Sequence, residues 1–74
     1  MLPRRNDPKW RVLVEQPDKY VFKFLALKIL MQRVARKAAA AISPAERESL
    51  TDEVFAFFQK NQTLLSDDIA AIFG

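Results

Sequence analysis

The fold is decided by residues 17–46, which read PDKYVFKFLALKILMQRVARKAAAAISPAE. Pro17 and Asp18 suit the first turn of a helix, and no glycine or further proline follows until Pro44. The body of the stretch ends in a run of alanines, and alanine has the highest intrinsic helix propensity. The stretch therefore predicts one long central helix over about residues 18–42.

Shorter helices are predicted on both sides of this one. Asp7-Pro8 suits the start of a short N-terminal helix, and the Ser43…Glu46 spacing of a capping box starts a helix over about 44–61. Ser66-Asp67-Asp68 predicts the cap of a short C-terminal helix. The predicted fold is all-α, a small three- to four-helix bundle in which residues 8–74 form a single helical domain. Residues 1–7 are expected to be a flexible basic arm.

The composition excludes most catalytic chemistry. The 74 residues include no histidine and no cysteine, and the one glycine is Gly74. A histidine base, a cysteine nucleophile and a glycine-rich phosphate loop are therefore absent, and a metal site would lack its two commonest ligand types. Adjacent carboxylates such as Asp67 and Asp68 point about 100° apart on a helix and do not converge on one atom. We expect no catalytic residues, no cofactor, no metal and no small-molecule substrate.

The predicted central helix carries two apolar faces, whereas a surface helix needs only one. The first face, which helix 44–61 is expected to cover, consists of Tyr20, Phe24, Leu27, Met31, Val34 and Ala38. The second face consists of Phe22, Leu25 and Ile29.

Two interpretations of the second face remain open. In one, the terminal helices cover it through Trp10, Leu13, Ile69, Ile72 and Phe73. In the other, it is a protein–protein interface, most simply that of a symmetric homodimer. Phe55 is expected to point away from the main apolar face of helix 44–61, and an exposed Phe55 would extend such an interface.

Charge divides the chain into a basic and an acidic half. Residues 1–42 carry ten Lys and Arg against three Asp and Glu, whereas residues 43–74 carry two against six. The basic half predicts a surface of this chain that binds the phosphates of nucleic acid. Its candidate contacts are Arg4, Arg5, Lys9, Arg11, Arg33, Arg36 and Lys37. The alternative is that the basic and acidic halves face each other in the fold.

The sequence thus predicts a non-enzymatic protein–protein interaction module: a regulator, inhibitor, adaptor or accessory subunit that binds another protein or itself. A small basic nucleic-acid-binding protein is the alternative. The apolar run 20–31 is too short to span a bilayer and contains Lys23 and Lys28, so no membrane span is expected. A chain without cysteine suits a reducing compartment, and a cytoplasmic location is expected.

Overall fold

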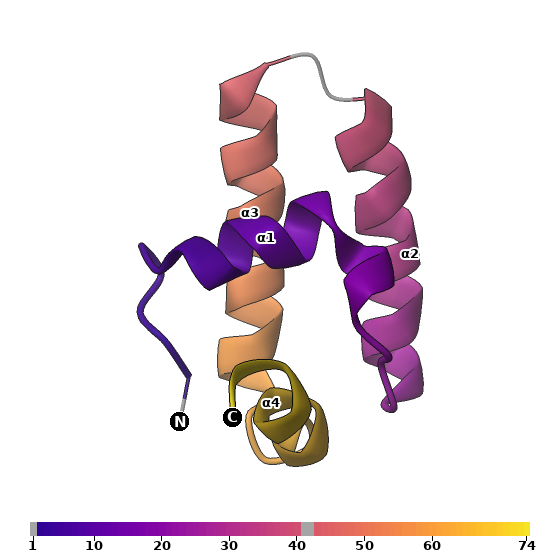
Figure 1. Ribbon diagram of the computed structural model, residues 1–74, viewed down its shortest axis with the longest axis vertical. Coiled ribbons are helices and arrows are strands. Elements are labelled where there is room, and N and C mark those ends of the chain that lie inside the picture. The colour runs from indigo at the N-terminus through magenta and orange to yellow at the C-terminus, as the bar shows by residue number, and fades with distance from the viewer. Residues whose placement is uncertain (1, 41–42) are drawn as a thin grey trace.

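The computed structural model describes residues 2–40 and 43–74, and these residues form an all-helical fold, as predicted. The elements are α1 (Pro8–Glu15), the 3-10 helix η1 (Pro17–Lys19), α2 (Leu25–Ala40), α3 (Pro44–Lys60) and α4 (Ser66–Phe73). Helices α2 and α3 run antiparallel beside each other, α1 crosses both of them, and α4 lies where α3 ends (Figure 1).

Local capping signals explain where α1 and α3 begin. The Asp7 side chain accepts a hydrogen bond from the Lys9 backbone N–H at 2.9 Å, with Pro8 in the first turn. Ser43 Oγ accepts from the Glu46 N–H at 3.2 Å. Each side chain satisfies a backbone donor that has no partner within the helix. Both predicted helix starts are confirmed.

The long central helix is a wrong prediction at its start. Pro17 and Asp18 begin only the three-residue η1, and the chain then stays non-helical until α2 starts at Leu25. The reason is a contact distant in sequence: the Asp68 carboxylate accepts the backbone N–H groups of Lys23 at 2.7 Å and Phe24 at 3.0 Å. These donors are therefore unavailable to a helix continuing from Asp18. The predicted end at residue 42 lies outside the described residues.

Asp68 has a different role from the one that the sequence indicated. Helix α4 begins at Ser66, its capping residue is Leu65, and no side chain caps it. The buried Asp68 instead caps the start of α2 by accepting the two backbone N–H groups directly before its first residue. The carboxylate suits that place because the N-terminal end of a helix carries partial positive charge.

The core lies where α1 crosses the α2–α3 pair. Trp10 is fully buried, and its ring centroid lies 5.1 Å from that of Phe55, 5.3 Å from Phe58 and 4.8 Å from Phe73. The indole N–H donates to the carbonyl oxygens of Pro3 and Arg4. Around this cluster the helices bury Leu13, Val14, Leu27, Leu30, Met31, Val34, Leu50, Val54, Phe58, Leu65 and Ile69. Helix α1 thus packs on the same side of α2 as α3 does, and the face of α2 opposite the core is left outside.

Candidate protein-interaction surface

Large aliphatic side chains are exposed to solvent on α2 and in the segment just before it. Val21 is 84% exposed, Leu25 is 68% exposed and Ile29 is 57% exposed. Leu25 and Ile29 are four residues apart on α2 and so lie on the same side, one turn from each other. We call Val21, Leu25 and Ile29 the apolar patch.

The structure separates the four residues that the sequence assigned to an interface. Leu25 and Ile29 lie together on the surface, whereas Phe22 and Phe55 are only partly exposed and pack against the core. Phe55 faces the Trp10 ring and does not point into solvent as expected. Val21 was not among the predicted interface residues, although it lies four residues before Leu25 and would also share its side in a helix. The turn after α3 exposes one more leucine, Leu64, at 62%.

An open groove of about 630 Å³ lies between residues 17–22 and one side of α2. Its apolar lining includes Tyr20, Val21, Phe22, Met31 and Ala35. Its polar lining consists of Asp18 from η1 and of Lys28, Gln32 and Arg36 from α2. Lys28 and Gln32 line this groove and lie three residues beyond Leu25 and Ile29 on α2, so the groove borders the side of α2 that carries these two side chains. We call this space the α2 groove.

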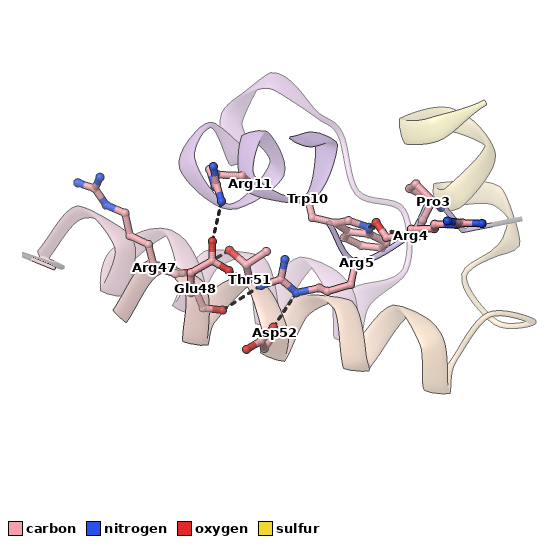
Figure 2. A network of polar contacts seen from close by, with 9 residues as sticks. All are labelled: Pro3, Arg4, Arg5, Trp10, Arg11, Arg47, Glu48, Thr51 and Asp52. Carbon is pink, nitrogen blue, oxygen red and sulfur yellow. Dashed lines mark hydrogen bonds and ion pairs between the residues drawn. The ribbon is translucent and has the colours of Figure 1, made fainter. Parts of the chain in front are cut away.

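Ion pairs join the N-terminal segment and α1 to α3 (Figure 2). Glu48 lies between two arginines: its Oε2 is 2.8 Å from Arg5 Nη2 and its Oε1 is 2.7 Å from Arg11 Nη2. Arg5 Nε also contacts Asp52 Oδ1 at 2.6 Å. Hydrogen bonds from Arg11 and Arg5 lower the pKa of the Glu48 carboxyl. Partial burial acts to lower the pKa of Arg5, but its bonds to Asp52 and Glu48 outweigh this and raise it.

A further ion pair links α2 to α3, between Arg33 Nη2 and Glu53 Oε1 at 2.6 Å. Arg5, Arg11 and Arg33, three of the seven predicted phosphate contacts, thus have carboxylate partners within the fold. The other four, Arg4, Lys9, Arg36 and Lys37, are exposed.

The predicted nucleic-acid contacts also do not form one surface. Residues 2–9 lie beyond α3, on the side away from α2, whereas Arg36 and Lys37 belong to α2 (Figure 1). Helix α3 stands between these two groups, since it contributes the carboxylates that pair with Arg5 on one side and Arg33 on the other.

Over residues 2–40 and 43–74, no three Asp or Glu side chains are grouped so that they could hold a metal ion. Within the same ranges, no helix is both long and apolar enough to cross a membrane. No protein-family model, curated protein or solved structure matches the chain.

Proposed function

We propose that this chain is a protein–protein interaction module that binds its partner on the apolar patch and the α2 groove. The observation that carries the proposal is the exposure of Leu25 and Ile29 on α2 and of Val21 in the segment before it. The other side of α2 is packed into the core. Monomeric proteins rarely expose large contiguous groups of aliphatic side chains. Where such groups occur, they mark interaction sites. The module acts by occupying a partner's surface, as a regulator, inhibitor, adaptor or accessory subunit would.

Nucleic-acid binding has less support than protein binding. Arg5, Arg11 and Arg33 already pair with carboxylates of α3. To neutralise a phosphate, each of them would have to leave its carboxylate or bind both anions at once. An aliphatic patch adds nothing to the recognition of a phosphate backbone. DNA binding is therefore kept as the alternative that the binding experiments below also test.

The test compares the wild type with the double variant Leu25→Ser/Ile29→Ser. Its probes are two synthetic helical peptides of about 18 residues, long enough to lie along α2. Both carry leucines at helical spacing, one with glutamates and one with lysines on the flanks of the apolar side. Binding is measured by fluorescence anisotropy, and we expect the double variant to weaken the better-binding peptide by at least about tenfold.

Leu64→Ser is the matched control because it removes an exposed leucine outside the apolar patch. We expect its affinity for the peptide to equal that of the wild type. Near-ultraviolet circular dichroism of the buried Trp10 verifies the fold of every variant. The proposal is wrong if the peptides bind neither protein, or if the Leu25→Ser/Ile29→Ser variant binds as well as the wild type. Duplex DNA that binds the wild type tightly at low salt, and loses affinity when Arg36 is replaced, would favour the nucleic-acid alternative.

A further inference from the structure

The charge around this surface identifies the kind of partner. We propose that the occupant is an acidic amphipathic helix of another protein, with its apolar side on the apolar patch and in the α2 groove. Its carboxylates would pair with Lys28 and Arg36. The inference rests on the proposed function and specifies the partner's chemistry.

The first step of the argument is the one-sided charge of the α2 region. Between Asp18 and Glu46 the sequence contains no Asp or Glu, but it contains Lys19, Lys23, Lys28, Arg33, Arg36 and Lys37. The carboxylate of Glu53 pairs with Arg33. Helix α2 therefore presents net positive charge beside exposed aliphatic side chains, and an anionic apolar partner complements both properties.

The second step is the geometry of the cations. Lys28, Gln32 and Arg36 are four residues apart, line the α2 groove and so form a polar row along one side of α2. Eight residues separate Lys28 from Arg36, about 12 Å along the helix axis. A partner helix with carboxylates two turns apart matches this distance and directs its apolar side chains between Tyr20, Phe22 and Met31. Asp18 is the one carboxylate among the lining residues, and it belongs to η1.

The third step concerns a second copy of the chain, which fits this surface less well. A symmetric pair would place two acid-free α2 helices against each other, each carrying Lys28, Arg36 and Lys37. Three of the four carboxylates of α3 are already engaged, because Glu48, Asp52 and Glu53 bind arginines of their own chain; the fourth is Glu46, in the first turn. The whole chain also carries a net charge of +3, which disfavours self-association.

The experiment compares the acidic and basic peptides defined above, which share one apolar pattern. We expect the acidic peptide to bind at least about tenfold more tightly at low salt and the difference to shrink as salt rises. Lys28→Glu/Arg36→Glu should weaken the acidic peptide by about tenfold or more and improve binding of the basic one. Arg47→Glu/Lys60→Glu is the matched control, since it makes the same change in net charge at exposed positions on α3.

The possible results separate this inference from the proposed function. If both peptides bind equally and only Leu25→Ser/Ile29→Ser weakens them, the apolar patch is a docking site but the inference of an acidic partner is wrong. A dissociation constant above about 1 mM for the acidic peptide would overturn the inference as well. Sedimentation velocity tests the second copy: we expect a monomer over the concentration range used for binding, and a dimer abolished by Leu25→Ser/Ile29→Ser would assign the surface to self-association.

Discussion

At the scale of single residues, the ion pairs on α3 decide which cations are engaged within the fold. The charge division of the sequence predicted either an anionic partner or pairing between the two halves, and Arg5, Arg11 and Arg33 pair with α3. Exposed ion pairs individually contribute little to stability. Their larger effect here is on binding, because they withdraw three arginines from any external anion.

Glu48 makes one of these contacts sensitive to acid. Its folded-state pKa is lowered below the ordinary 4.5 by Arg11 and Arg5, so the unfolded chain binds more protons in this range. The stabilisation is therefore complete above about pH 4.5 and is lost as pH falls through the folded-state pKa. We expect Glu48→Gln to lower the urea midpoint at pH 7, and the difference from wild type to disappear in acid.

Glu15→Gln is the control for this prediction, because Glu15 is exposed on α1 and outside the Glu48 network. Its urea midpoint at pH 7 should match that of the wild type. A Glu48→Gln difference that persists unchanged at pH 3 would contradict the assigned ion pairs.

At the scale of helices, the starts of α1 and α3 carry local capping signals and were predictable, whereas the start of α2 was not. Asp7 and Ser43 cap helices that begin at the following residue, so sequence spacing alone located α1 and α3. Helix α2 takes its cap from Asp68, 44 residues beyond Phe24, and no local pattern contains that information.

The candidate surface was predictable to a similar extent. Helical periodicity placed Leu25 and Ile29 on a second apolar face of the central helix, either covered by the terminal helices or open as an interface, and in the structure both side chains are exposed. Val21 is exposed in the non-helical segment before α2 and was not among the predicted interface residues. Phe55 is partly buried because α1 crosses α3 and places the Trp10 ring against it. That contact belongs to the tertiary packing, which helical periodicity does not describe.

Replacement of Asp68 tests the connection between α4 and α2. Asp68→Ala leaves two backbone N–H groups without an acceptor in a buried site, and we expect a loss of about 3 kcal/mol in the free energy of unfolding. Asp68→Asn keeps one acceptor oxygen and should lose about half as much. Urea denaturation followed by circular dichroism measures both. Asp67→Ala, at the exposed neighbouring position, is the control and should change the free energy of unfolding by less than about 0.5 kcal/mol. Equal losses at the two positions would refute the assignment of Asp68 as the cap of α2.

At the scale of the whole molecule, a single aromatic cluster connects segments from both ends of the described chain. Trp10 contacts Phe73 of α4 as well as Phe55 and Phe58 of α3, and its indole N–H reaches back to the carbonyls of Pro3 and Arg4. A chain of this size is stabilised by only a few kcal/mol in total. Each of these contacts is therefore a substantial share of the stability.

Deletion of residues 1–6 tests the role of the segment that the sequence described as a flexible basic arm. The deletion keeps the Asp7 cap but removes Arg5, the two carbonyls that accept the Trp10 N–H, and Leu2, which packs against the core. We expect a loss of about 2 kcal/mol in the free energy of unfolding and a red shift of Trp10 fluorescence. Arg4→Ala keeps the backbone carbonyl and should resemble the wild type. An unchanged stability after the deletion would establish a loose arm.

The cap that Asp68 provides has a consequence for the order of events during protein synthesis. The ribosome adds Asp68 forty-five residues after Lys23, so the nascent segment before α2 emerges without its acceptor. The contact between Trp10 and Phe73 also forms only after α4 has been synthesised, because Phe73 belongs to α4. Domains fold as units once their sequence has left the exit tunnel. Ribosome-bound chains stalled before α4 should consequently be cleaved by protease around residues 20–25, whereas chains stalled far enough downstream for α4 to emerge should be protected there.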